Sequence, residues 1–269
     1  MIGLADILVR IVADRRSRLA GEGDPRLPDA GADCSAPLAP GDNPLLGALA
    51  LRRGSAVIAE VKMGSPRLGS LAGRIDPEAQ ARRYAAHGAA ALSVVVEPDH
   101  FGGSYELLTR CREASGLPAL AKDFVVDLRQ LEWARDAGAD GVLLIAALYG
   151  ATELRAWAAA ARRMGLAPLV ETHGEEDLAK LAGAVWELVG VNNRDLRTFE
   201  VDIEASLGMV ARLPEPALKV AESGISSGAE VERLASAGFD AFLIGESLLL
   251  AEDPAAKLRS LLDPEGAAA

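Results

Sequence analysis

The chain has 269 residues, of which 50% are hydrophobic and 25% are charged, and this is enough to bury one sizeable core. Its formal net charge of -11 argues against nucleic acid or an anionic membrane as a partner, because both attract basic surfaces. The sequence has no CxxC pair and no Cys/His ligand cluster, so it indicates neither a disulfide framework nor a structural zinc site, and a reduced, cytoplasmic compartment fits.

The first 45 residues differ in character from the rest. Residues 1–20 are amphipathic, and their apolar stretch is short and charged at both ends, which excludes a signal peptide and a membrane span. We expect a helix that packs on the main domain. Residues 21–45 are rich in Gly, Pro and Asp and predict a linker or mobile loop without a regular element. This divides an N-terminal segment, 1–45, from a single catalytic domain, 46–269.

From residue 46 onward, short apolar runs alternate with helix-like stretches about every 20 to 30 residues. Nearly continuous apolar runs are typical of parallel strands that are covered by helices. We count eight such runs, at residues 56–61, 90–96, 118–122, 140–146, 167–172, 187–192, 218–223 and 241–245.

The stretches between the runs carry helix signals. Residues 76–88 have Asp76 at a cap position, Pro77 in the first turn and Gly88 at the end. Eight strand–helix units predict a (β/α)8 TIM barrel with an extra N-terminal helical segment. The alternative is a doubly wound open sheet. It is less favoured because the count is eight, and because polar residues follow strand after strand, as catalytic residues do at one face of a barrel.

The polar residues at the strand ends are the candidates for chemistry. Each alone is more often a solvated, paired or turn residue. Together they converge on one mouth, where lysines that face carboxylates would perturb one another's pKa values. In chain order they are Glu60, Lys62, Glu97, Ser104, Lys122, Asp123, Glu171, Asn192, Asn193, Arg194, Asp195, Glu222, Ser223, Glu246 and Ser247.

Two glycines follow the last two strands, in "ESGI" and "IGES". Gly224 and Gly245 stand where backbone would approach a ligand closely, and barrels commonly bind a phosphate between these two loops. Glu246 would repel a phosphate if its side chain pointed inward. We therefore expect it in the first turn of the last helix, lending only its backbone N–H.

Several blocks of the sequence, in order over about residues 55 to 250, resemble the indole-3-glycerol phosphate synthase family of tryptophan biosynthesis. They include "VIAEVK…SP…G", "ALSVVVEPDHFGGS", "LVETH", "VAESGI" and "AFLIGESLL", and the pair "KDF" and "NNRDL" is the most specific. The resemblance implies a carbon–carbon lyase (EC 4.1.1.48) that closes the pyrrole ring of 1-(2-carboxyphenylamino)-1-deoxyribulose 5-phosphate. Carbon dioxide and water leave, and no metal or organic cofactor is implied.

The resemblance also implies catalytic roles. Lys122 would protonate the substrate carbonyl, a step that requires its pKa to be tuned downward. Glu171 would act as general base or electrostatic partner, Glu60 would transfer a proton in the dehydration, and Lys62 would bind the substrate carboxylate or phosphate. Which lysine acts in which step stays open. The implied catalytic set is Glu60, Lys62, Lys122, Glu171, Asn192 and Ser223.

Substrate binding is implied in the same way. The anthranilate ring needs an apolar slot, the carboxylate needs a cation, and the phosphate needs backbone N–H groups. The implied binding residues are Ser65, Phe101, Phe124, Leu143, Arg194, Leu196, Glu222, Gly224, Gly245, Glu246 and Ser247.

The departures from the family pattern lie mostly near the N-terminus. Met63 stands where the family usually has a basic residue, and Gly64 and Arg67 also differ. The segment 21–45 looks unlike the family's usual linker helix. We expect these differences to affect loop motion and kinetics, and not the chemical residues.

Three other readings compete with this one. A phosphoribosylanthranilate isomerase would need Cys and Asp at strand ends, but Cys111 falls in the second helix of the barrel. A non-catalytic barrel would have lost a catalytic residue, and a specialised-metabolism copy would have identical chemistry. The expected partner is a small phosphorylated substrate. A monomer or weak homo-oligomer, and association with other enzymes of the pathway, stay open.

Overall fold

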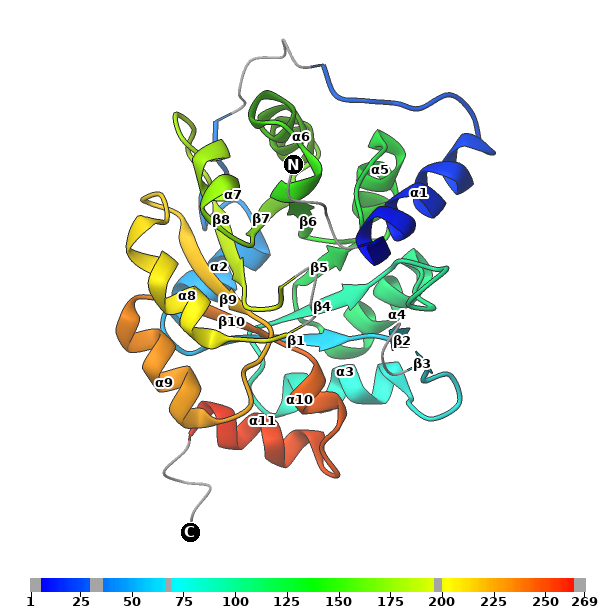
Figure 1. The fold of residues 1–269 in the computed structure, drawn as a ribbon. Coiled ribbons are helices and arrows are strands. Elements are labelled where there is room, and N and C mark those ends of the chain that lie inside the picture. Colours follow the sequence, from blue (N-terminus) through cyan, green and yellow to red (C-terminus); the bar gives the residue numbers. More distant parts are fainter. Residues whose placement is uncertain (1–5, 30–35, 66–68, 196–199, 264–269) are drawn as a thin grey trace.

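The computed structural model describes residues 6–29, 36–65, 69–195 and 200–263. Eight parallel strands close into a barrel in the order β1-β10-β9-β8-β7-β6-β5-β4, with helices around it (Figure 1). This confirms the TIM barrel and rules out the open sheet. The strands are β1 (Ala56–Val61), β4 (Ala91–Val95), β5 (Ala119–Lys122), β6 (Gly141–Ile145), β7 (Ala167–Thr172), β8 (Leu188–Asn192), β9 (Leu218–Glu222) and β10 (Ala241–Ile244).

The helix predicted from the signals in residues 76–88 is confirmed as α3 (Pro77–Ala86). Asp76 caps the helix after β1 by accepting the N–H of Ala79, and Gly238 ends the helix after β9 with a φ of 111°. The outer helices are α3 (Pro77–Ala86), α4 (Tyr105–Ser115), α5 (Leu128–Asp136), α6 (Ala151–Arg163), α7 (Glu175–Lys180), α8 (Ile203–Met209), α9 (Gly228–Ala237) and α11 (Pro254–Leu262). Short additions are β2 (Gly64–Ser65), β3 (Gly69–Ser70), the turns η1 (Ala146–Leu148) and η2 (Val210–Arg212), and α10 (Glu246–Leu249).

A short apolar helix, α2 (Pro44–Leu51), closes the N-terminal end of the barrel. Its Leu45, Leu46 and Leu49 are buried in the cluster that fills the barrel interior, and Asn43 caps it. The prediction that residues 21–45 hold no regular element is therefore wrong at its end, because α2 begins at Pro44. The division drawn at residue 45 passes through this helix.

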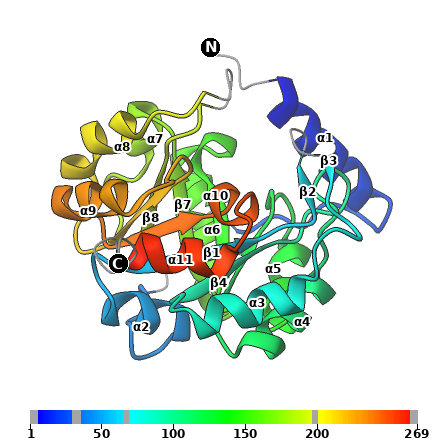
Figure 2. The ribbon, with the colours of Figure 1, turned by 90° about the horizontal axis from the view of Figure 1, so that it is seen from below.

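The N-terminal helix, α1 (Asp6–Ala20), lies over the other end of the barrel, where the strands end (Figure 2). Leu8, Val12 and Leu19 form a small apolar cluster with Val126. The predicted packing of this helix on the main domain is confirmed. Within the described residues, no helix is both long and apolar enough to span a membrane.

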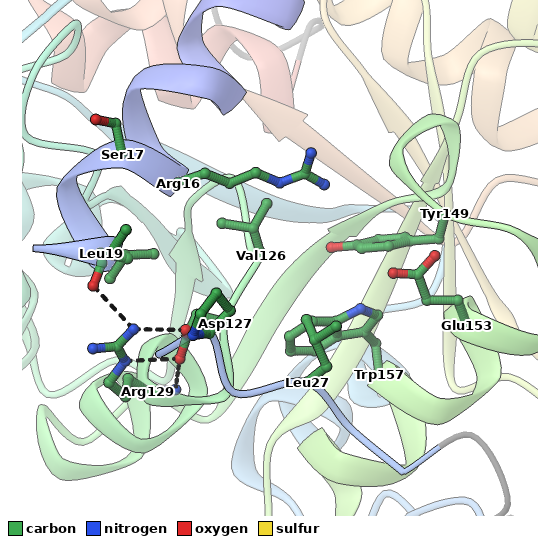
Figure 3. A pocket seen from close by; sticks show the side chains of 12 residues that line it. Arg16, Ser17, Leu19, Leu27, Val126, Asp127, Arg129, Tyr149, Glu153 and Trp157 are labelled. Carbon is green, nitrogen blue, oxygen red and sulfur yellow. Dashed lines mark hydrogen bonds and ion pairs between the residues drawn. The ribbon is translucent and has the colours of Figure 1, made fainter. Parts of the chain in front are cut away.

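A cavity of about 410 Å³ separates part of α1 from the barrel (Figure 3). Arg16 reaches over it from α1, and the rings of Tyr149 and Trp157 line the opposite wall. Asp127 and Arg129, which form an ion pair at 2.8 Å, line a further side. None of the residues expected at the catalytic mouth lines this cavity, so it is distinct from the expected active site.

Candidate active site at the mouth of the barrel

The acid and the base of "EVK" point to the same side of β1, as period-2 alternation requires. Lys62 Nζ lies 2.8 Å from Glu60 Oε1. Lys122, at the end of β5, reaches across the barrel mouth, and its Nζ lies 3.5 Å from Glu60 Oε2 and 3.6 Å from Glu222 Oε2 at the end of β9. These residues come from three strands of which no two are neighbours, so only closure of the barrel brings them together.

Glu60 is an ionised carboxylate in this arrangement. Burial by itself raises the pKa of Glu60, but attraction to Lys62 and Lys122 outweighs burial and lowers the pKa to about 2. Glu60 therefore holds no proton to donate at neutral pH.

Lys122 behaves opposite to the expectation that its pKa is tuned downward. Burial does lower the pKa of Lys122, but attraction to Glu60, Glu222 and Glu171 outweighs burial and raises the pKa well above the usual value. The downward shift that proton donation requires is therefore absent from the site as it stands here, because carboxyl groups surround the amine.

Glu222 is the neutral carboxyl of the cluster. It is fully buried, and burial together with the negative charge of Glu171 raises its pKa well above the ordinary range. The contact with Lys122 at 3.6 Å opposes this shift without cancelling it. Glu171 itself accepts a hydrogen bond of 3.0 Å from Asn192 Nδ2. The mouth thus holds neighbouring carboxyl groups in different protonation states.

Two glycines make room for these carboxyl groups in the barrel wall. A Cβ atom on Gly190 would collide with Glu222 Oε1, and one on Gly245 would collide with Glu60 Oε1. Gly245 was expected only to let backbone approach a ligand, and the structure gives it this further role. Gly190 was not expected at the site at all.

Ser223 stands in a strained backbone conformation directly after β9. Its φ of 67° lies in the left-handed region, and Gly224 follows with a φ of 78°. Asn193 fixes this turn, because its Nδ2 donates to the carbonyl of Ser223 at 2.9 Å while its Oδ1 accepts from the hydroxyl of Ser206 at 2.6 Å. Asn193, one of the strand-end candidates in the sequence, is therefore a buried residue that links the turn after β9 to helix α8.

Two phenylalanines lie together at the mouth, as the apolar slot requires. The ring centroids of Phe101 and Phe124 are 6.1 Å apart. The buried Glu97 fixes the loop that carries Phe101, because the Glu97 carboxylate accepts a hydrogen bond of 3.0 Å from the backbone N–H of Phe101. Leu143 is buried in the barrel interior. Leu196, the remaining member of the expected slot, lies outside the described residues.

The two expected anion-binding loops follow β9 and β10. Glu246 lies in the first turn of α10, as expected, and its Oε2 is 3.5 Å from a guanidinium nitrogen of Arg194. Ser247 Oγ donates to the carbonyl of Ile225 at 2.8 Å. Ser65 lies in β2, and Arg67 lies outside the described residues.

His173 was missed by the sequence reasoning. It follows Glu171 by two positions at the end of β7, and its Nε2 lies 3.3 Å from Glu171 Oε1. The signal was available in "ETH", because the same alternation that pairs residues 60 and 62 puts residues 171 and 173 on one side.

Comparisons with known proteins agree with this geometry. The sequence profile of the family described as "Indole-3-glycerol phosphate synthase" matches residues 8–261. An indole-3-glycerol phosphate synthase from Koribacter versatilis is 46% identical over 209 residues, which cover 78% of this chain and 80% of that protein.

Solved structures share the fold at low identity. A 3-hexulose-6-phosphate synthase from Salmonella typhimurium matches with a TM-score of 0.61 and 16% identity, over 77% of this chain and 96% of that one. A thiamine phosphate pyrophosphorylase from Pyrococcus furiosus matches with a TM-score of 0.56 and 18% identity, over 78% and 95%. At these identities the likeness supports the barrel alone.

Proposed function

Since the chain belongs to the indole-3-glycerol phosphate synthase family, the decarboxylating lyases of tryptophan biosynthesis (EC 4.1.1.48), we propose that the cluster around Lys122 is its active site. The observation that carries this proposal is the position of the Lys122 amine, which lies within 3.6 Å of carboxyl groups from both β1 and β9. A protonated amine at the middle of the mouth is what ring closure onto a ketone needs.

In the first step, the aromatic carbon that bears the carboxylate bonds to the ketone carbon, and Lys122 gives its proton to the ketone oxygen. A substrate that separates Lys122 from Glu60 and Glu222 removes the attraction that raises the pKa of the amine. Burial, which lowers the pKa, remains. The proton therefore becomes easier to donate when the substrate is bound. The carboxylate of Glu171 stabilises the positive charge that develops on the substrate nitrogen.

In the later steps, carbon dioxide leaves and its bonding electrons restore the aromatic ring. The hydroxyl group then leaves as water with a proton from an acid, and a base removes a proton from the adjacent carbon to complete the pyrrole. Glu60, with a pKa of about 2, is not that acid in the resting site. We assign the acid to Lys62 or Lys122, both held by Glu60, and the base to Glu171.

Substrate recognition uses the surrounding loops. The aryl ring lies in the slot that Phe101 and Phe124 form, and the substrate carboxylate binds Lys62 or Arg194. The backbone N–H groups of Gly224, Gly245, Glu246 and Ser247 bind the phosphate, while Asn192 and Ser223 orient the reacting groups. Glu246 keeps its own carboxylate turned toward Arg194, at 3.5 Å.

Turnover of 1-(2-carboxyphenylamino)-1-deoxyribulose 5-phosphate tests the assignment, followed by the fluorescence of indoleglycerol phosphate. We expect Lys122→Ala to lower kcat by a factor of about 100 to 10,000, the range typical of a lost general acid. Lys219→Ala is the matched control, because Lys219 pairs with Glu215 away from the mouth. A folded Lys122→Ala enzyme with kcat within a few-fold of the wild type would refute the role of Lys122.

The same purified protein also tests the two alternative functions, an isomerase and a non-catalytic binding protein. Cys111 is buried in α4 and away from any strand end, so an isomerase with a cysteine acid or base is not supported. If the protein isomerised phosphoribosylanthranilate without ring closure, that result would nevertheless favour the isomerase. Stabilisation by substrate analogues without turnover would favour a binding protein.

The substrate class, the cellular location and the oligomeric state of the protein are also proposals. On the basis of the family, we propose a small phosphorylated substrate, a cytoplasmic location, and a monomer or weak homo-oligomer that can associate with other enzymes of the pathway. Sedimentation of the protein alone and with those enzymes measures the assembly directly.

A further inference from the structure

His173 stands directly against the carboxylate of Glu171. Its Nε2 lies 3.3 Å from Glu171 Oε1, and its Nδ1 lies 3.8 Å from Asp177 Oδ2. The His173 side chain is only 11% exposed, and within the described part of the chain neither ring nitrogen makes a well-directed hydrogen bond. The ring therefore has a carboxylate facing each of its two nitrogens.

The side of the ring away from Glu171 is anchored by α7. Asp177 Oδ2 accepts the backbone N–H of His173 at 3.1 Å, and Asp177 Oδ1 accepts from Lys180 Nζ at 2.9 Å. Lys180 Nζ also donates to the carbonyl of Ala146, directly after β6, at 2.9 Å. This chain of contacts fixes Asp177, and Asp177 in turn faces the imidazole from a fixed position.

The charged groups that face the His173 ring favour its cationic form. They are Glu171 on β7, Asp177 on α7 and Lys122 on β5. Burial and Lys122 lower the pKa of His173, but the two carboxylates outweigh them and raise it.

We propose that His173 is a positioning residue that keeps the negative charge of the Glu171–Glu222 pair on Glu171, an inference that rests on the proposed role of Glu171 as the base. Both oxygens of Glu171 have a neighbour that favours the anion, Asn192 at 3.0 Å and His173 at 3.3 Å. The oxygens of Glu222 make no hydrogen bond within the described residues. Two adjacent carboxyl groups avoid double ionisation, so the proton goes to the less stabilised one, Glu222.

Kinetics against pH test the proposal. In His173→Ala, the acid limb of the profile of kcat/KM should move to higher pH, because Glu171 loses its cation. At a fixed pH on that limb, we expect kcat/KM to fall about tenfold, which corresponds to a displacement of about one pH unit, with KM nearly unchanged. His173→Gln should recover part of kcat while the limb stays displaced, since an amide donates but carries no charge. His87→Gln is the control, because His87 follows the end of α3, away from the mouth, and its ring is hydrogen-bonded to the carbonyl of Arg83.

A second readout needs no turnover. The ring of His173 can be titrated by NMR in the wild type, Glu171→Gln and Glu222→Gln. We expect Glu171→Gln to lower the pKa of His173, and Glu222→Gln to leave it nearly unchanged because Glu222 is already neutral. The inference would be overturned if both substitutions changed the pKa of His173 equally, or if neither changed it. This holds whether or not the enzyme turns over. The expected titrations without turnover would instead refute the proposed function and leave the charge assignment standing.

Discussion

Gly190 shows how a single missing side chain makes a buried carboxyl group possible. It pairs with Glu171 in the ladder between β7 and β8, and the space that a Cβ would take is filled by Glu222. The same relation holds between Gly245 and Glu60. Close approach, and not backbone conformation, is the reason for glycine here, since the φ of neither residue lies in the left-handed region.

Gly190→Ala should therefore act through Glu222. The added methyl group collides with the carboxyl, and overpacking of this kind typically costs about 1–3 kcal/mol. We expect a lower unfolding temperature together with lower kcat. Gly208→Ala is the control, because a Cβ there meets nothing within 4 Å.

A double-mutant cycle sharpens this test. Glu222→Ala removes the atoms that the new methyl group strikes, so Gly190→Ala should cost much less stability in that background. Equal costs in both backgrounds would show that the collision with Glu222 is not the cause.

At the scale of elements, α1 is held to the barrel by a buried ion pair. Arg15 lies 2.6 Å from Asp123, with both side chains almost fully buried. Asp123 also accepts from the Tyr105 hydroxyl at 2.9 Å and from Gln130 at 2.8 Å. Because Asp123 directly follows Lys122, this contact ties the N-terminal helix to the strand end that carries the proposed acid.

Arg15→Met should loosen α1 more than the barrel. Breaking a buried pair costs about 3–5 kcal/mol when the remaining charge stays buried, but undocking of α1 exposes Asp123 to water and limits the loss. We expect faster hydrogen exchange over residues 8–19 with a small change in the unfolding temperature. Arg16→Met, one residue along and facing the cavity in Figure 3, should leave that exchange unchanged. Equal protection in both variants would contradict the role of Arg15.

The elements also show what sequence could and could not predict. The run 56–61 coincides with β1 because parallel strands in a barrel are apolar on both faces. Helix α2 was missed because "PLLGALAL" is apolar all round and shows no amphipathic period, the mark of a fully buried helix. The sequence placed Lys122 and the carboxyl groups around it at one mouth, but the direction of the pKa shift depends on distances between side chains from β1, β5, β7 and β9, which no local pattern shows.

At the scale of the whole molecule, two carboxyl groups at the barrel mouth make the stability of the fold depend on pH. Their contributions change with pH in opposite directions. The pKa of Glu60 falls from 4.5 to about 2, which corresponds to roughly 3 kcal/mol of stability. That contribution is present above the unfolded pKa and is lost as pH falls toward 2. Glu222, whose pKa is raised, keeps a proton that the unfolded chain releases, so its contribution declines as pH rises above the unfolded value.

Glu222→Gln should therefore change the pH dependence of stability in a defined direction. The amide mimics the neutral carboxyl and does not titrate, so the unfolding free energy of the variant relative to wild type should increase as pH rises from 5. Glu60→Gln is the opposing control. It removes stability that the wild type has at neutral pH, so its deficit should shrink as pH falls from 5 to 3. Urea unfolding across this range measures both. A pH-independent difference for Glu222→Gln would show that Glu222 is already ionised in the folded enzyme, and parallel slopes for the two variants would show that the cluster does not separate its carboxyl groups by charge.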